Sequence, residues 1–334
     1  MAPMFARNAA ASWLGRGADE ARRGWAPDIA VGFHRAGRAP RHYVRAMPTA
    51  ATDDDKVPPA GDTEPAFEFL PGDDAGGLVL LCDHASNRLP AGYGSLGLPP
   101  SELERHIGYD IGAAALTRGL AERLGVPAVL SCFSRLLIDP NRGLDDPTLI
   151  MRLSDGSVVP GNARLDAAER QARIDRYYRP YDEAIDRVLR RALASGHVPA
   201  VLSVHSFTPI WRGRPRPWHA GILWDSDPRL ARPLIDGLAA GGDLVVGDNE
   251  PYHGALKGDT LYRHATRRGL AHALIEVRQD LIADSAGVHE WVDRIATVLA
   301  AFDLGSSPHG ISYFGSLTGP VEALPWPEAD GAQA

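Results

Sequence analysis

Cysteine is scarce in this chain, and long apolar runs are missing. The 334 residues include only two cysteines, Cys82 and Cys132, and each lies inside an apolar run that is typical of a strand. This placement argues against a disulfide framework and favours a reducing compartment, so we expect a cytoplasmic protein. No stretch approaches the roughly twenty consecutive apolar residues that a membrane-spanning helix needs, so we expect no membrane partner.

An excess of positive charge is also missing, as are the glycine motifs of nucleotide-binding proteins. The formal net charge of −7 gives no basic surface for nucleic acid, so none is expected as a partner. Neither GxGxxG nor a P-loop pattern follows the first expected strand, so nucleotide binding has no support. The apolar fraction of 44% is ample for a packed core. The sequence does not indicate an oligomeric state.

The two ends of the chain differ from the middle. Residues 1–46 are rich in Arg, Ala and Gly, and residues 47–62 have the Pro, Ala and Asp composition of a linker. We therefore expect residues 1–62 to be a disordered or spurious extension with its linker. The folded domain is expected over residues 63–304, followed by a loose tail over residues 305–334.

Strand-like and helix-like segments alternate through the middle of the chain. Short apolar runs predict strands, and longer runs with helical spacing of apolar residues predict helices. The expected strands are 78–82, 128–138, 200–204, 220–224, 244–247 and 271–277, and the expected helices are 100–124, 166–194, 230–238 and 289–302. This order predicts one α/β domain of three layers, with a mixed, mostly parallel central sheet flanked by helices.

Polar side chains recur where the expected strands end. In an open α/β sheet the carboxyl ends of the strands share one edge, so residues far apart in the sequence converge there. The first strand is followed by Asp83 and His84, the second contains or precedes Arg135, Asp139, Asn141 and Arg142, the third precedes His205 and Ser206, and the last contains Glu276.

This set of residue types indicates metal-assisted hydrolysis of an amide. Two neutral imidazoles and one carboxylate make a three-ligand zinc site that leaves a position for water, and a further carboxylate serves as general base. An arginine beside an amide side chain grips a substrate carboxylate in a two-pronged geometry. A Ser-His-Asp hydrolase with Ser86 or Ser206 as nucleophile is the competing chemistry, but neither serine lies in a GxSxG elbow.

Six segments together resemble the N-formylglutamate amidohydrolase family. They are DHASNRLP, GYDIGA, SRLLIDPNR, SVHSFTP, LKGDTLYRHA and LIEVRQDL, and the resemblance covers residues 78–302. The family is related to the zinc carboxypeptidases and aspartoacylases, which implies the same three-layer fold. It also implies a zinc enzyme that cleaves N-formyl-L-glutamate to formate and glutamate in histidine breakdown.

The resemblance implies a role for each matching residue. His84 and His205 are expected to bind Zn²⁺, and Glu276 is expected to be the catalytic base. Asn141 and Arg142 are expected to hold the substrate carboxylate, with Arg142 counted among the catalytic residues as well.

The third metal ligand is the least determined position. The carboxypeptidase relatives have a glutamate three residues after the first histidine, and this chain has Asn87 there. Asp110 in GYDIGA is the expected replacement, with Asp83 as the alternative. If neither served, the chain would be a metal-free binding protein of the same fold.

Several further residues are expected to contact the substrate. Arg135 either pairs with Asp139 or contacts the substrate directly. Lys257, Arg263 and His264 lie in a loop punctuated by glycine that would supply positive charge to an anionic substrate, unless the loop is simply solvated. Residues 212–219 (RGRPRPWH) are expected to form a rim that selects the substrate. Another acylated amino acid or a small peptide remains an alternative substrate.

Overall fold

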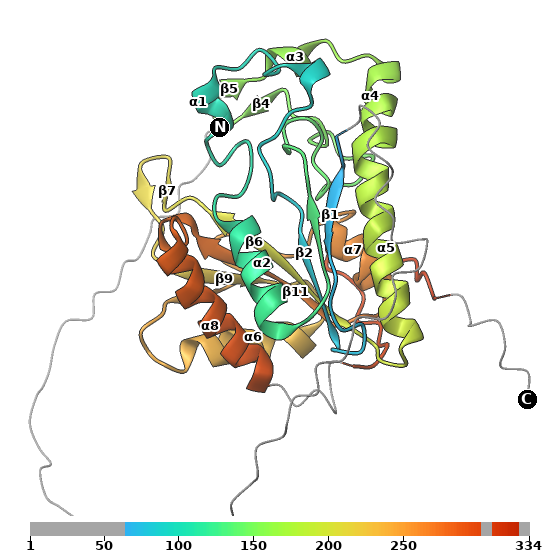
Figure 1. The fold of residues 1–334 in the computed structure, drawn as a ribbon, viewed down its shortest axis with the longest axis vertical. Helices are drawn as coiled ribbons and strands as arrows, with labels where there is room; N and C mark the ends of the chain where they lie inside the picture. The colour runs from blue at the N-terminus through green and yellow to red at the C-terminus, as the bar shows by residue number, and fades with distance from the viewer. Residues whose placement is uncertain (1–63, 302–308, 327–334) are drawn as a thin grey trace, which may run out of the picture. The chain divides into compact units, whose positions relative to one another are not determined.

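The computed structural model describes residues 64–301 and 309–326 (Figure 1). The chain divides into a unit of residues 1–56 and a unit of residues 57–334, and all of the described residues belong to the second unit. The extension expected over residues 1–62 lies outside the described residues. The tail expected over residues 305–334 is described only from 309 to 326.

A mixed sheet of seven strands forms the centre of the domain (Figure 1). Across the sheet the strands are β1 (Phe67–Leu70), β3 (Ala128–Ser131), β2 (Leu78–Cys82), β6 (Ala200–Phe207), β11 (His272–Arg278), β9 (Ala220–Leu223) and β10 (Val246–Asp248). Neighbouring strands are parallel except for β1 on β3 and β9 on β11. The prediction of a mixed, mostly parallel sheet is confirmed.

Helices cover both faces of this sheet, which confirms the three-layer prediction. The helices α2 (Ala113–Leu124), α6 (Pro228–Ala239) and α8 (Ser285–Ala301) pack on one face (Figure 1). The other face carries α4 (Ala167–Arg173), a π-helical turn (Ile174–Tyr178), α5 (Arg179–Ala194) and α7 (Thr260–His264). The expected helices 166–194, 230–238 and 289–302 correspond to α4 through α5, to α6 and to α8.

The remaining elements are short. They are α1 (Pro100–Leu103), α3 (Pro160–Ala163), the hairpins β4 (Leu153–Ser154) with β5 (Ser157–Val158) and β7 (Ile210–Trp211) with β8 (Arg214–Pro215), and the 3₁₀ turns Ala91–Tyr93, Thr266–Arg268 and Gln279–Leu281. β8 lies in the segment 212–219 that was predicted to be a rim, and β7 directly precedes that segment.

The alternation of side chains along the strands divides the core into two parts. On β2, Leu80 and Cys82 face α2, whereas Val79 and Leu81 face α5. All four are fully buried, which explains why the run 78–82 is apolar at every position instead of alternating.

The single helix expected over residues 100–124 is wrong. The chain forms α1, leaves the helix at Glu104, and begins α2 only at Ala113. Two glycines interrupt the helical pattern, and Gly112 has φ = +81°, a left-handed conformation that an L side chain disfavours. The apolar spacing continues through this break because Ile107 is buried in a separate small cluster.

The strand expected over residues 128–138 is too long, and one strand of the central sheet was not expected, in addition to the four short hairpin strands. β3 ends at Ser131, and residues 132–138 are irregular although Leu136, Leu137 and Ile138 are fully buried. The apolar residues between 132 and 138 are therefore apolar because they are buried, and not because they form a strand. The missed strand is β1, whose residues are only partly buried at the edge of the sheet.

The described C-terminal residues follow the surface of the domain without regular structure. The backbone N–H of Ser312 donates to the carbonyl of Gly269 at 2.8 Å, and that of Leu317 donates to Oδ1 of Asp225 at 2.8 Å. Residues 309–326 are thus tied to the loops that border β9 and β11.

Candidate active site

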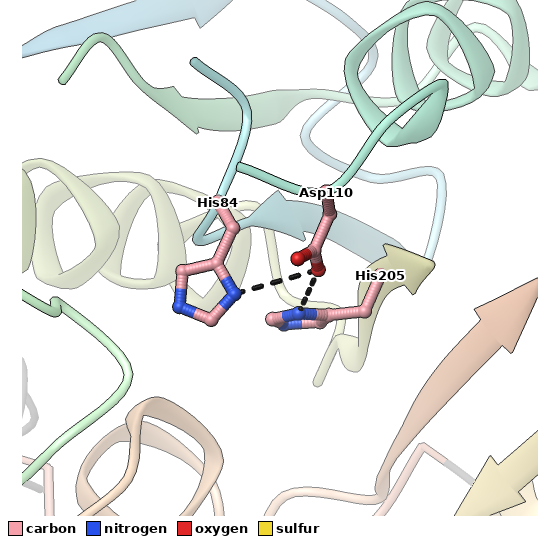
Figure 2. Close-up of side chains that lie close together, drawn as sticks. All are labelled: His84, Asp110 and His205. Atoms are coloured by element: carbon pink, nitrogen blue, oxygen red, sulfur yellow. Dashed lines mark hydrogen bonds and ion pairs between the residues drawn. The ribbon is translucent and has the colours of Figure 1, made fainter. Parts of the chain in front are cut away.

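Three buried side chains from separate elements point toward one another (Figure 2). His84 follows β2, Asp110 lies in the loop before α2, and His205 is in β6. Oδ2 of Asp110 lies 3.4 Å from Nδ1 of His84 and 2.8 Å from Nδ1 of His205. One nitrogen or oxygen from each residue lies within 4.8 Å of the others, so the three atoms can bind one cation.

The break between α1 and α2 places Asp110 in this group. The backbone N–H of Asp110 donates to the carbonyl of His84 at 2.9 Å, which fixes the loop against the end of β2. The carbonyl of Asp110 then accepts from the N–H of Ala113 at the start of α2. Because Asp110 is outside any helix, its carboxylate is free to turn toward the two histidines.

Asp139 fixes the orientation of His84. Its Oδ1 lies 2.8 Å from Nε2 of His84, and its Oδ2 accepts from Arg135 at 2.8 Å. Although burial would raise the pKa of Asp139, the guanidinium of Arg135 and His84 lower it well below its usual value, so the group is a carboxylate. A carboxylate only accepts, so Nε2 carries the proton and Nδ1 presents its lone pair to the site.

Asp83 supports His205 from the opposite edge of its ring. Oδ2 of Asp83 lies 3.0 Å from Nε2 of His205, whereas Nδ1 of that ring faces Asp110. Hydroxyl groups donate to Asp83 as well, from Tyr181, Ser203 and Thr260 at 3.1, 2.9 and 2.7 Å. Burial would raise the pKa of Asp83, but His205, His84 and the hydroxyl of Thr260 lower it to about 2. Asp83 therefore positions a ligand from behind.

The donor set fits a zinc ion. Nδ1 of His84 is buried without a hydrogen-bond partner, as a metal ligand requires. Burial would lower the pKa of His205, but Asp110 and Asp83 raise it well above its usual value, because the two ring nitrogens lie between two carboxylates. Two imidazoles and a carboxylate, each imidazole held by a second carboxylate, match the three-ligand sites of zinc hydrolases.

Asn87 lies outside this group. Its side chain donates to the carbonyl of Leu103 at 3.2 Å and to Oε1 of Glu104 at 3.2 Å. Asn87 thereby ties the strand end to the turn after α1.

A cavity of about 330 Å³ opens next to the three side chains. Glu276 lines it from β11 and is paired in register with His205 on the parallel strand β6, so both side chains project from the same face of the sheet. Burial is the main cause that raises the pKa of Glu276, and the charge of Asp110 raises it as well. Against the opposing influence of His205 and Arg135, the net pKa is about 8. Oε2 of Glu276 is buried and unpaired.

Arg135, Asn141 and Arg142 line the same end of the cavity. The backbone N–H of Asn141 donates to Asp139 at 2.9 Å, and Oδ1 of Asn141 accepts from the N–H of Thr260 at 3.1 Å. The guanidinium of Arg142 donates to its neighbour's carbonyl at 2.8 Å and to Thr148 at 3.1 Å, and its carbonyl is held by Tyr178. A positive group and an amide are thus anchored beside the metal ligands.

Lys257, Arg263 and His264 do not line the cavity. Lys257 is exposed. Arg263 donates to Asp182 at 3.0 Å and to the carbonyl of Pro140, while Nε2 of His264 lies 2.7 Å from the same Asp182 carboxylate. Arg263 and His264 therefore brace the loop before Asn141, and their expected contact with substrate stays a prediction.

The two serines considered as nucleophiles have other partners. Ser206 donates its hydroxyl to the carbonyl of Ile111 at 2.7 Å, and Oγ of Ser86 accepts from the N–H of Arg88 at 3.0 Å. Neither is hydrogen-bonded to a histidine, so the triad geometry of a serine hydrolase is not formed by them.

Sequence reasoning missed the residues that support the site from behind. Thr260, Tyr181 and Ser203 all donate to Asp83, and they come from α7, α5 and β6. The spacing of residues in the sequence does not indicate that Asp83 is a buried carboxylate with several hydrogen-bond donors around it. The signals available were the N-cap pattern DT before α7 and two polar residues, Ser203 and His205, on one face of an otherwise apolar strand.

Arg216, in the predicted rim, is also more enclosed than expected. Its guanidinium lies over the rings of Tyr252, Trp211 and Phe207 at 4.9, 5.3 and 5.5 Å and donates to the hydroxyl of Tyr252 at 2.9 Å. It fixes the aromatic wall of the cavity from outside.

A comparison with protein families decides what this arrangement belongs to. The model of the N-formylglutamate amidohydrolase family matches residues 76–283, which is more than half of the chain and includes every residue of the site. This chain belongs to the N-formylglutamate amidohydrolase family. Its members are hydrolases of amide bonds, so the enzyme class expected from the sequence is confirmed.

Solved structures share the fold of this chain. A gene product of Agrobacterium tumefaciens is 35% identical, with a TM-score of 0.66 over 71% of this chain and 96% of that one. An N-formylglutamate amidohydrolase from Ralstonia eutropha has the same fold at 23% identity, with a TM-score of 0.55 over 70% of this chain and 95% of that one. No curated protein matches the chain. Within residues 64–301 and 309–326, no helix is both long and apolar enough to cross a membrane.

Proposed function

We propose that this member of the family is a zinc-dependent amidohydrolase of small N-acyl amino acids that carry a free carboxylate. N-formyl-L-glutamate, cleaved to formate and glutamate, is the example that the family name supplies, and a cytoplasmic role in histidine breakdown would follow from it. The observation that carries the proposal is the convergence of three ligand atoms from His84, Asp110 and His205 beside the unpaired carboxyl of Glu276.

Glu276 is the general base of the proposed reaction. Zinc bound to the three ligands would polarise the amide carbonyl and lower the pKa of a water molecule. Glu276 takes the proton of that water through Oε2 and passes it to the leaving nitrogen, so one carboxyl serves both halves of the reaction. Its raised pKa suits this role, because the group then binds and releases a proton near neutral pH.

Arg135 and Arg142 supply positive charge to the reacting carbonyl oxygen and to the substrate carboxylate, respectively. Nε of Arg135 is buried without a partner while its terminal nitrogen is held by Asp139, so the guanidinium is preorganised toward the reacting carbonyl oxygen. Arg142 and Asn141 hold the substrate carboxylate and so orient the amide.

Metal content measured together with activity tests the proposal. We expect one equivalent of zinc in the purified protein and hydrolysis of N-formyl amino acids that chelators abolish and zinc restores. His84→Ala and His205→Ala should lose both zinc and activity, while the control His289→Ala, in an exposed position of α8, should lose neither. A folded protein without zinc and without turnover would favour the alternative of a metal-free binding protein.

A further inference from the structure

The cavity extends well beyond the group of residues that performs the reaction. It follows β11 from Glu276 past Leu274 to His272, three residues that share one face of the strand. β9 runs antiparallel beside it, pairing Gly221 with Glu276 and Leu223 with Leu274, and continues into Asp225. Four residues of strand separate the two ends by about 13 Å. This length exceeds what a formyl group and its amide need.

The far end of the cavity is polar, and its walls are apolar. Leu223, Leu274 and Leu261 form the walls, and the far end is lined by Asp225, Thr266 and His272. Asp225 is 8% exposed. Its Oδ1 accepts from the N–H of Leu317 at 2.8 Å and from Ser226 at 3.2 Å, whereas Oδ2 has no hydrogen-bond partner among residues 64–301 and 309–326. Asp225 thus presents an unpaired carboxylate oxygen at this end of the cavity, where a ligand can reach it.

The other two groups leave only hydrogen-bond acceptors at this end. Nδ1 of His272 lies 2.8 Å from the carbonyl of Leu270, which only accepts, so Nδ1 carries the proton. Burial lowers the pKa of His272, so the ring is neutral and Nε2 accepts from the hydroxyl of Thr266 at 3.1 Å. The hydroxyl proton is then used, and Thr266 offers its lone pairs alone.

The arginines that line the described cavity are both at its metal end: Arg135 is paired with Asp139, and Arg142 is the carboxylate clamp. Arg229, whose charge acts on His272 at the far end, does not line the cavity and is paired with Asp227 at 2.6 Å. A second carboxylate on the substrate that extended along β11 would therefore meet Asp225 and no lining arginine. A substrate group that only donates hydrogen bonds would meet the acceptor atoms of Asp225 and Thr266 there.

We propose that Asp225, with Thr266 and His272, forms a subsite for a protonated amine at the end of the substrate's side chain. The preferred substrate is then an N-acyl amino acid with one carboxylate and an extended, basic side chain, and not a dicarboxylate. This inference rests on the proposed function for the reaction itself, but the recognition of the amine depends only on the far end of the cavity.

Three substrates that differ at one end test the subsite in the unaltered, zinc-loaded enzyme. They are Nα-formyl-L-lysine, N-formyl-L-norleucine, which lacks the ammonium group, and N-formyl-L-glutamate. We expect kcat/KM to be about tenfold or more higher for the lysine derivative than for either of the others, because a hydrogen bond to a charged group is gained. A preference for glutamate, or equal values for lysine and norleucine, would overturn the subsite.

Asp225→Asn locates the effect. It keeps an oxygen for the N–H of Leu317 but removes the charge, and we expect the lysine to norleucine ratio to fall about tenfold. Asp236→Asn, in an exposed position of α6, makes the same change in net charge and should leave the ratio unaltered. A ratio that is unaltered in Asp225→Asn contradicts the assignment.

Binding separates the subsite from the reaction. If no formyl amino acid is hydrolysed, the proposed function fails, and calorimetry of the lysine and norleucine derivatives on zinc-loaded Glu276→Gln still decides the inference. Binding of the lysine derivative about tenfold tighter supports the subsite, and equal affinities refute it.

Discussion

The two faces of the central sheet are equally well covered, but they are built from different residue types. The face under α2, α6 and α8 is packed with aliphatic side chains such as Leu80, Val204 and Ile275. On the opposite face the same strands carry Ser203, His205 and Glu276, all of them buried. Within one strand, such as β6, the residue that faces the aliphatic core contributes to stability, and its neighbour on the opposite face contributes to the site. Mutations of aliphatic residues on the first face should change stability without changing the site, and mutations of the polar residues on the second face should do the reverse.

The largest expected effect is on the polar face. Glu276→Gln keeps the shape of the side chain but removes the base, so turnover should fall by about 10³-fold or more while zinc stays bound. Steady-state kinetics and metal analysis of the same preparation measure both. Full activity in this variant would remove Glu276 from the mechanism.

The aliphatic face should respond in stability. Leu80→Ala deletes a fully buried side chain and leaves a cavity between β2 and α2, so the free energy of unfolding should fall by about 2–5 kcal/mol. Chemical denaturation measures the loss. Zinc affinity of the folded fraction should be unaltered, and a weakened zinc site would show that the two faces are coupled.

Asp83→Asn tests a residue that touches no substrate. The amide would place a donor among groups that already donate to Asp83, so His205 would lose its fixed orientation and zinc affinity should fall about 10–100-fold. Competition with a chromogenic chelator measures the affinity, with Asp236→Asn as the control. Unchanged affinity would mean that β6 alone orients the ring.

The last prediction concerns a pH dependence at Asp259, which caps α7 and lines the cavity. Burial raises its pKa to about 7 from an ordinary value of 3.8, so the folded state holds a proton that the unfolded state has already lost. Stability should therefore fall as pH rises between these values, by up to about 1.4 kcal/mol per pH unit, and stay level above pH 7.

Asp259→Asn should remove this slope, because an asparagine still accepts from the N–H of Tyr262 but does not ionise. In urea denaturation from pH 4 to 8, the free energy of unfolding of the variant should increase relative to that of the parent protein as pH rises. Parallel stability curves for the two proteins would show that Asp259 titrates normally.

Periodicity predicted most of the fold, and strand-end position predicted residues that converge in the candidate site. The errors of both have physical causes. Runs such as 78–82 are readable because a strand covered on both faces is apolar throughout. Leu136, Leu137 and Ile138 are equally apolar but lie in a buried loop, which a run of apolar residues does not distinguish from a strand. The break at residues 104–112 was hidden because the buried residues on either side keep helical spacing.

For the site, the order of the strands accounts for what was predictable. His84 directly follows the end of β2, and His205 and Glu276 lie in β6 and β11. These three strands are adjacent in the sheet, so a shared edge brings the three residues together. Asp83, Thr260 and Tyr181 meet only through the packing of α5 and α7 on the sheet, and no local pattern reports such contacts. The acceptor-only far end of the cavity depends in the same way on backbone partners of Asp225 and His272.

The left-handed turn at Gly112 has a wider consequence. A Cβ atom there would lie 2.4 Å from the carbonyl oxygen of Ile282, in the loop that leads into α8. Two main chains are thus in direct contact two residues beyond Asp110. Any side chain at position 112 would push the loop outward and carry the carboxylate with it. The position of Asp110 therefore depends on the contact between two loops that are far apart in the sequence. A change in the packing of α8 would move the Asp110 carboxylate away from His84 and His205.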